Sequence, residues 1–430
     1  MGIKKTFIKN TSFNIMSYAY LVIAAIISIP VLVHALGIRA FGFYTLVISL
    51  GPILSVFDFG ISQATIRFLA LPDYDEKKKV KVWQTSYFFF ALAGAALFLI
   101  VLALFQFYFF RLPISGIVTN KIALMFVVAT TIFFSHINTH FLTLPQSKSR
   151  YDIYSLNAFI AGSTNTWIAA LAALILPSIL LIASVRLAGV LFTLLTMWLY
   201  SRRHYAAVTI PRFHPEAWRE MISFGVRSFA GRVFSALEAY GLNFVLASYI
   251  ALQAVTYFSI PQSLIIKAAG GISMLTLSLF PLSTSLLTKD GIFKLKKLII
   301  WLQASVLSLG LLAVGVIFVF GKPLLLLWLR NPDLVEQAYP ILQILSLQLF
   351  LTSLTPMPTA VFESMNLPQI PSFFALLTVL VEVLFIALLL PRFGVNGVAY
   401  AISGGAAITV PIFLFIFFDR FRKYEKSLAA

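Results

Sequence analysis

The chain has 430 residues, of which 60% are hydrophobic and 11% charged, and its mean hydropathy is +0.95. An average soluble domain carries about 25% charged residues, so this composition excludes an ordinary soluble fold. The net charge of +17 does not indicate nucleic-acid binding, because the basic residues stand in short turns with no basic and aromatic groove between them.

Twelve apolar stretches follow one another along the chain, each long enough to cross a bilayer as a helix. Their predicted ranges are 10–36, 42–70, 82–110, 119–145, 152–177, 179–201, 218–249, 252–287, 295–320, 335–363, 368–391 and 396–418. The first follows a basic segment, as a signal peptide does, but it is long enough to span and no small-residue cleavage site follows it. The sequence therefore predicts an all-α polytopic membrane protein with 12 transmembrane helices.

The basic residues predict the orientation of these spans. Of the 32 lysines and arginines, 21 lie at the two ends of the chain and in every second gap, whereas six lie in the opposite gaps. Positively charged loops resist translocation, so the gaps rich in lysine and arginine are expected on the cytoplasmic side. Both termini are then cytoplasmic.

The longest predicted cytoplasmic connection, residues 201–218, divides the spans into six plus six. We expect an N-terminal lobe of residues 1–203 and a C-terminal lobe of residues 204–430. A weak internal repeat agrees with this division, since Ser12–Ala19 at the first span resembles Ser223–Ala230 near the start of the seventh. Both halves begin on the same side, so the repeat is parallel, and two such bundles are expected to enclose a central cavity.

Five cations lie inside the apolar stretches, where an ionised side chain costs at least a few kcal/mol unless it is paired or hydrated. Arg67 is near the end of its span and is expected to extend to the interface. The other four either form buried ion pairs or line a wet cavity for a phosphate-bearing ligand, because guanidinium groups bind phosphate oxygens bidentately. The predicted substrate-binding residues are Arg186, Arg227, Arg232, Lys267, Asn14 and Asn243.

Three carboxylates also lie inside predicted spans and away from the span ends: Asp58, Glu238 and Glu382. Each could pair with a cation, or could titrate and couple transport to an ion, because burial raises the pKa of a carboxyl group. His136 and His140 share a helix face, as zinc ligands often do, but no third ligand lies near them and a polar wall is the favoured interpretation. No metal, cofactor or catalytic centre is expected, and the absence of cysteine excludes thiolate chemistry.

Three glycine-containing segments carry a family resemblance. Ala35–Tyr44 and Phe57–Arg67 resemble the opening of bacterial polysaccharide flippases, the O-antigen type within the multidrug and oligosaccharide-lipid exporter superfamily, and Pro391–Ala401 resembles the turn before the last span of that family. The resemblance covers essentially the whole chain in length and span count. It implies a MATE-like fold of two six-helix lobes in the bacterial inner membrane.

The resemblance also implies a function. A member of this family would move undecaprenyl-pyrophosphate-linked oligosaccharide repeat units from the cytoplasmic to the outer leaflet by alternating access, and its partners would be that lipid, the membrane lipids and polysaccharide polymerase machinery. The alternatives are an ion-coupled multidrug exporter, a lipid II exporter of the same superfamily and a membrane glycosyltransferase or polymerase. The excess of intramembrane cations argues against a carrier of cationic drugs, and the short outer gaps argue against an enzyme.

Overall fold

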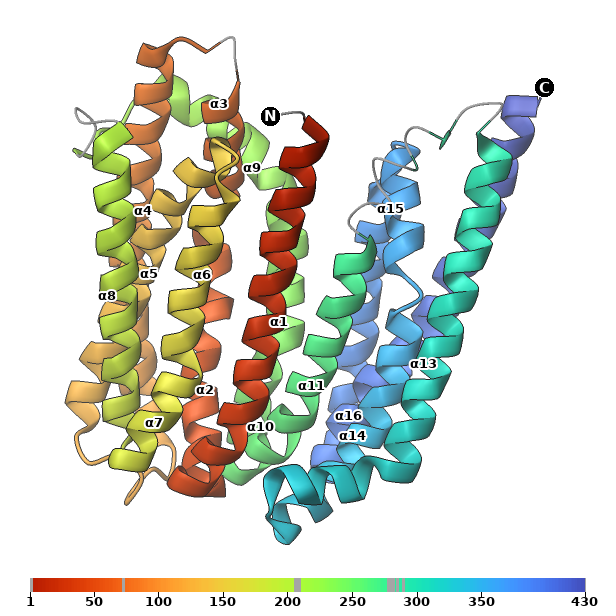
Figure 1. Cartoon of the computed structure of the whole chain (residues 1–430). Coiled ribbons are helices and arrows are strands. Elements are labelled where there is room, and N and C mark those ends of the chain that lie inside the picture. Colours follow the sequence, from red (N-terminus) through yellow and green to blue (C-terminus); the bar gives the residue numbers. More distant parts are fainter. Residues whose placement is uncertain are drawn as a thin grey trace. The chain divides into compact units, whose positions relative to one another are not determined.

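The computed structural model describes the backbone except at residues 1–2, 72–73, 205–209, 277–282, 284–285, 288–290 and 430. Side chains are in addition not described at residues 3–15, 204, 226–232, 234–235, 273–276 and 427–429. The described part of the chain is helical and contains no strand, which confirms the predicted all-α class (Figure 1). Within this part, nine helices are long and apolar enough to cross a membrane, whereas the count of twelve spans stays a prediction.

The longest of these helices is interrupted near its middle. α16 (Gln369–Ala429) contains a 58-residue candidate span, which at 1.5 Å per residue is far longer than a bilayer is thick. Gly394 interrupts it with φ 57° and ψ −133°, a backbone conformation that only glycine adopts readily. The interruption falls between the two predicted spans 368–391 and 396–418, so α16 consists of two helices joined by a kink at Gly394, and the two crossings stay a prediction.

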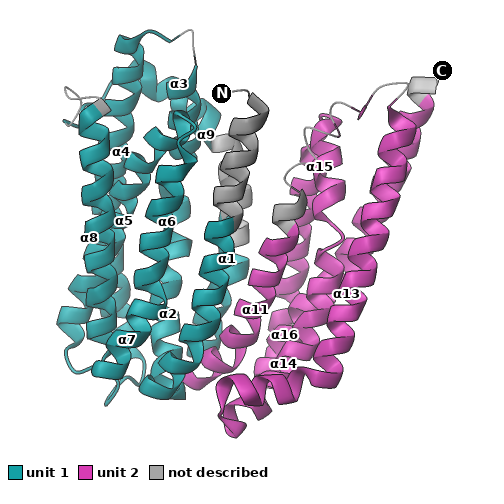
Figure 2. Ribbon diagram, viewed as in Figure 1, with its two compact units in different colours: residues 1–248 teal, residues 249–430 magenta. Residues whose placement is uncertain are grey.

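The chain divides into two compact units, residues 1–248 and 249–430 (Figure 2). The predicted lobes, 1–203 and 204–430, stay a prediction. The helix of residues 215–236 packs against the helices of residues 61–70 and 76–107, so compactness alone groups it with the preceding helices.

The first unit holds the helices up to α10. These are α1 (Ile3–Leu36), α2 (Ile38–Ser55), η1 (Val56–Asp58), α3 (Ile61–Ala70), α4 (Glu76–Phe107), η2 (Phe109–Arg111), α5 (Lys121–Ser147), α6 (Tyr151–Asn165), α7 (Trp167–Ile175), α8 (Ile179–His204), α9 (Pro215–Ala236), η3 (Leu237–Gly241) and α10 (Leu242–Tyr249). α5 lies at the centre, in contact with α4, α8 and α3, while α1 packs on α6 and α7. Asp75 and Asn120 begin α4 and α5 as N-caps, each side chain accepting a bond from a backbone N–H of the first turn.

Three predicted spans of the first unit are interrupted helices. The span 42–70 breaks at η1 and Gly60, the span 152–177 breaks at Thr166, and the span 218–249 contains η3, a π-helical segment. Inside a membrane such breaks occur where the backbone is covered by protein or lines a hydrated cavity. Each break lies beside a polar residue of the predicted site, as described below.

The second unit holds α11 (Leu252–Thr276), α13 (Ile292–Leu329), α14 (Pro332–Thr352), α15 (Pro356–Ser364) and α16. α14 packs against α11, α13 and α16. An aromatic core joins the beginning of α13 to the end of α16, where the buried rings of Phe362, Phe413 and Phe417 pack against Leu295 and Ile299. This core fixes the orientation of α13 about its own axis.

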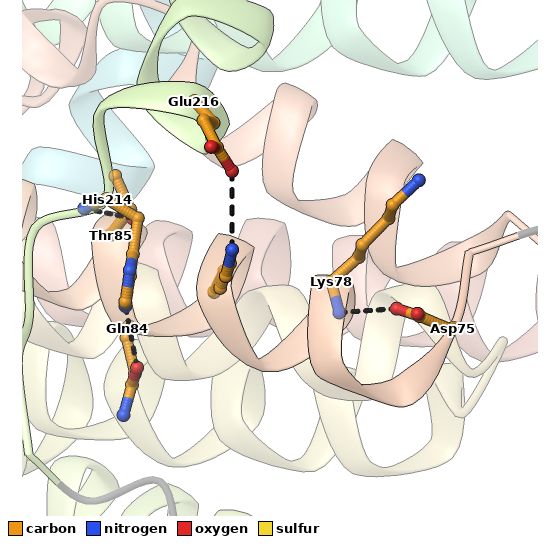
Figure 3. A network of polar contacts seen from close by, with 7 residues as sticks. Asp75, Lys78, Gln84, Thr85, His214 and Glu216 are labelled. Atoms are coloured by element: carbon orange, nitrogen blue, oxygen red, sulfur yellow. Dashed lines mark hydrogen bonds and ion pairs between the residues drawn. The ribbon is translucent and has the colours of Figure 1, made fainter.

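Polar contacts hold the segment that leads into α9 against α4 (Figure 3). The backbone N–H of His214 donates to Thr85 Oγ1 at 3.1 Å, and the imidazole Nε2 bonds Gln84 Oε1 at 2.9 Å. Lys81 Nζ lies 3.3 Å from Glu216 Oε2 in the first turn of α9. Burial, followed by the charges of Lys81 and Arg212, lowers the pKa of His214, so the neutral imidazole is the favoured form in this contact.

Candidate functional site

Arg186 lies on α8 of the first unit, beside the break between α6 and α7, and is partly exposed. Its Nε donates to Asn165 Oδ1 at 2.7 Å. Asn165 is the last residue of α6, and the backbone departs from helical geometry at the next residue, Thr166. The interrupted span therefore supplies the acceptor that orients the guanidinium.

The Arg186 side chain lines a cavity of about 40 Å³ between α2, α5 and α8. Tyr44 and Thr131 contribute the other polar side chains of the wall, and the remaining lining is apolar. The Tyr44 phenol lies beside the guanidinium and is only 3% exposed. A guanidinium carries five N–H donors, so donors remain for an anionic oxygen after the bond to Asn165. In this conformation the cavity has room for a few water molecules, and a larger headgroup requires it to widen.

Asn243, on α10, makes a second polar contact with α2. Its Nδ2 donates to Ser49 Oγ at 2.9 Å, and the Asn243 side chain is 3% exposed. Ser49 follows Tyr44 by five residues, which places the two about 140° apart around α2. The contacts of Arg186 and Asn243 therefore lie on different sides of α2 and do not share one chamber in this conformation.

The structure gives the three predicted carboxylates different surroundings. Asp58, in η1, is 2% exposed and accepts bonds from the Gly60 backbone N–H and from Ser62 Oγ, both at the start of α3. Glu238 lies in the π-helical segment η3 and is half-buried. Glu382, in α16, is 4% exposed and packs against Gly405, where an added Cβ would lie 2.6 Å from Glu382 Cγ.

Lys267 belongs to α11 in the second unit. Its Nζ donates to the Ser263 carbonyl oxygen at 3.3 Å, one turn earlier on the same helix, and its side chain is half-buried. The side chains of Arg227, Arg232 and Asn14 lie outside the described residues, so their predicted roles stay predictions. Arg67 is exposed at the end of α3, with its guanidinium 4.5 Å from the centre of the Phe224 ring.

The two histidines of α5 are enclosed among aromatic rings of the first unit. His140 is fully buried, bonds Ser86 Oγ through Nδ1 at 3.0 Å and stacks on Tyr87 with 5.0 Å between ring centres. His136 is 4% exposed and faces Phe90. Within the described residues no three His, Cys, Asp or Glu side chains come together in a way that could hold a metal ion.

Two residues of the Arg186 site, Tyr44 and Asn165, were not among those predicted from the sequence. Tyr44 is the last residue of the segment 35–44, which carries part of the family resemblance. Asn165 lies in the polar run Ser163–Thr166, which interrupts an otherwise apolar span. A polar run in the middle of a span was the signal that could have identified it.

The described part of the chain is an all-helical fold with buried polar side chains at breaks in its spans, as in a polytopic membrane protein. Residues 7–287 match the sequence profile of the family described as polysaccharide biosynthesis protein. The chain belongs to this family. This confirms the resemblance derived from the three glycine-containing segments.

Known proteins resemble the chain over nearly its whole length. A Shigella flexneri protein named "Putative O-antigen transporter" is 23% identical over 407 residues, which are 92% of this chain and 94% of that protein. Among solved structures, the lipid II flippase MurJ in an inward closed conformation matches with a TM-score of 0.74 and 14% identity, over 98% of this chain and 91% of that chain. An inward-facing MATE family multidrug transporter matches with a TM-score of 0.73 and 17% identity, over 97% of this chain and 96% of that chain. These structures confirm the MATE-like fold.

Proposed function

We propose that this transporter flips a polyprenyl-pyrophosphate-linked oligosaccharide, in bacteria an undecaprenyl-pyrophosphate repeat unit, from the cytoplasmic to the outer leaflet of the inner membrane. The observation that carries the proposal is the family match over residues 7–287. The name of the Shigella relative and the lipid II flippase among the structural neighbours support a lipid-linked sugar as the substrate class.

The chemistry of such a substrate sets what the protein must provide. A pyrophosphate and several sugars cannot enter hydrocarbon without losing their hydrogen bonds to water, whereas the apolar polyprenyl chain partitions into the bilayer core. A polar route through the protein, opened alternately to each side by movement of two lobes, meets both needs. Polysaccharide polymerase machinery on the outer side would then receive the flipped unit.

In this proposal the intramembrane cations bind the pyrophosphate. Arg186 supports it with a guanidinium that is oriented by Asn165 and lines a cavity. Arg227, Arg232 and Lys267 are assigned the same role, and Asn14 and Asn243 are assigned to the sugars. The carboxylates Asp58, Glu238 and Glu382 are the candidates for coupling transport to an ion. Replacing Arg232 with alanine should abolish surface polysaccharide while the protein remains inserted and abundant.

The experiment that tests the function compares lipid-linked intermediates in cells with and without the gene. A flippase defect leaves repeat units on the inner leaflet, where an impermeant outer-surface glycosidase cannot reach them. A polymerase defect leaves single units on the outer leaflet, accessible to the same glycosidase. A multidrug exporter would instead alter drug susceptibility with surface polysaccharide unchanged, and a lipid II flippase defect would stop cell-wall growth.

A further inference from the structure

We propose that the beginning of α13 carries a binding site for one anionic phospholipid of the cytoplasmic leaflet. The site is an open hollow of about 460 Å³ in the second unit. Phe293, Lys296, Lys297, Ile300, Trp301 and Ala304 line it. Each of these residues has another of the set three or four positions away, so they form one continuous face of α13.

The opposite face of the same helix holds this surface in place. Ile292, Leu295 and Ile299 are at most 3% exposed and belong to the aromatic core shared with α15 and α16. With that face fixed in the core, the lysine and tryptophan face is directed away from the unit. The exposed fractions of Phe293, Ile300 and Trp301 are 70%, 56% and 63%.

Charges at the hollow favour an anion. Lys296 Nζ lies 2.9 Å from Glu425 Oε1 of α16, and this contact compensates its charge. Lys297 is exposed, and no ion pair of its ammonium group is seen within the described part of the chain. The hollow therefore presents one uncompensated cation, Lys297, next to an apolar lining.

The order of residues along α13 matches the layers of a membrane interface. After Phe293 come the two lysines, Trp301 follows Lys297 by four residues on the same face, and the apolar part of the span continues from there. Tryptophan is enriched at the level of the lipid headgroups, where its N–H can donate to a headgroup oxygen while the ring lies in the apolar layer. A phospholipid would place its phosphate at Lys297 and one acyl chain along Ile300 and Ala304.

The cytoplasmic leaflet supplies such a ligand. This end of α13 is predicted to be cytoplasmic, and the anionic lipids of that leaflet attract basic residues close to the membrane. A general attraction would depend only on the number of cations. A site depends on which lysine faces the hollow, and this difference makes the proposal testable.

The test measures lipid binding to the purified full-length protein by native mass spectrometry, with dioleoyl phosphatidylglycerol titrated against dioleoyl phosphatidylcholine. We expect the wild type to retain phosphatidylglycerol preferentially and Lys297→Gln to weaken that binding by about fivefold. Lys294→Gln is the matched control, because Lys294 is an equally charged, exposed lysine on the same turn that does not line the hollow. Equal weakening in both variants, or no preference in the wild type, would overturn the proposal.

A second measurement does not depend on the lysine variants. Brominated phosphatidylglycerol should quench part of the fluorescence of the six tryptophans, and Trp301→Phe should remove that part. Quenching that is unchanged in Trp301→Phe contradicts the site. Undecaprenyl pyrophosphate should not displace the bound phosphatidylglycerol. Displacement would assign the hollow to the substrate pathway and end this proposal, whereas the proposed flippase function would stand.

Discussion

Gly60 and Gly225 touch through their backbones, where α9 crosses the start of α3. A Cβ added to Gly60 would lie 2.3 Å from the Gly225 carbonyl oxygen, and one added to Gly225 would lie 2.5 Å from the Phe59 carbonyl oxygen. Both obstacles are backbone atoms, so no side-chain rotation can relieve them. Gly225→Ala should therefore destabilise the protein by about 1–3 kcal/mol, the usual cost of overpacking. Thermal unfolding in detergent measures this loss.

Gly315→Ala is the matched control for this prediction. Gly315 lies inside α13, and no atom lies within 4 Å of an added Cβ there. Alanine also has a higher helix propensity than glycine, so the control should be neutral or slightly stabilising. If Gly225→Ala unfolds at the same temperature as the wild type, α9 does not cross α3 at this close distance.

The contact of His214 with Gln84 predicts a dependence of stability on pH. The folded-state pKa of His214 is lowered by burial and by the neighbouring cations, so the folded protein binds fewer protons here than the unfolded chain. The stabilisation is present above the unfolded pKa of about 6.5 and is lost as the pH falls through the folded pKa. The melting temperature should therefore fall between about pH 7.5 and 5 by more than it does in His214→Gln.

Glutamine keeps a donor for Gln84 Oε1 but does not titrate, so His214→Gln separates protonation from the loss of the hydrogen bond. Other groups titrate in the same range, and only the difference between the two melting curves reports on His214. His34→Gln is the control, because His34 is exposed on α1 and bonds the Pro30 carbonyl oxygen of its own helix. Parallel pH profiles for wild type and His214→Gln would refute the prediction.

Hydropathy predicted the helical class and most helix ends because a bilayer forces each apolar stretch to satisfy its backbone within a helix. The same pattern did not locate the interruptions at Gly60 and Thr166, because a few polar residues, such as the run Ser163–Thr166, change the mean hydropathy of a whole span only slightly. Hydropathy also did not predict that the helix Pro215–Ala236 belongs to the same compact unit as the preceding helices. That grouping depends on particular contacts, such as His214 with Gln84, which hydropathy does not encode.

The candidate site was predictable by residue type but not by position. An intramembrane arginine is expensive enough to single out Arg186, and the structure indeed gives it a cavity and an oriented acceptor. Its partner is the uncharged Asn165, which no count of charges identifies. Asp58 has a local structural role that its residue type did not indicate. It is a buried carboxylate and an ion-coupling candidate, but it also accepts the hydrogen bonds from Gly60 and Ser62 at the start of α3.

The buried contact between Asn243 and Ser49 should stabilise the packing of α10 on α2. Asn243→Ala leaves the Ser49 oxygen without its donor, whereas the Ser49 hydroxyl still donates to the Thr45 carbonyl oxygen. A double-mutant cycle with Asn243→Ala and Ser49→Ala should give a coupling of about 1 kcal/mol. Unfolding of all four proteins in detergent measures it. Additive losses would show that the two side chains do not interact in the folded protein.

Arg186→Ala should reduce the export of surface polysaccharide by about 10- to 100-fold, the range expected when one charge-assisted hydrogen bond to an anionic substrate is lost. The cavity wall keeps Tyr44 and Thr131, so the variant should still insert and reach the abundance of the wild type. Surface polysaccharide is measured by gel electrophoresis of cell extracts at matched protein levels.

Arg392→Ala is the control, because it removes an equal charge from an exposed position at a predicted outer turn and should leave output unchanged. Arg186→Lys keeps the charge but loses the planar fork, so its output should lie between those of alanine and arginine. Wild-type output from Arg186→Ala would exclude this guanidinium from the transport pathway and leave it only its structural bond to Asn165.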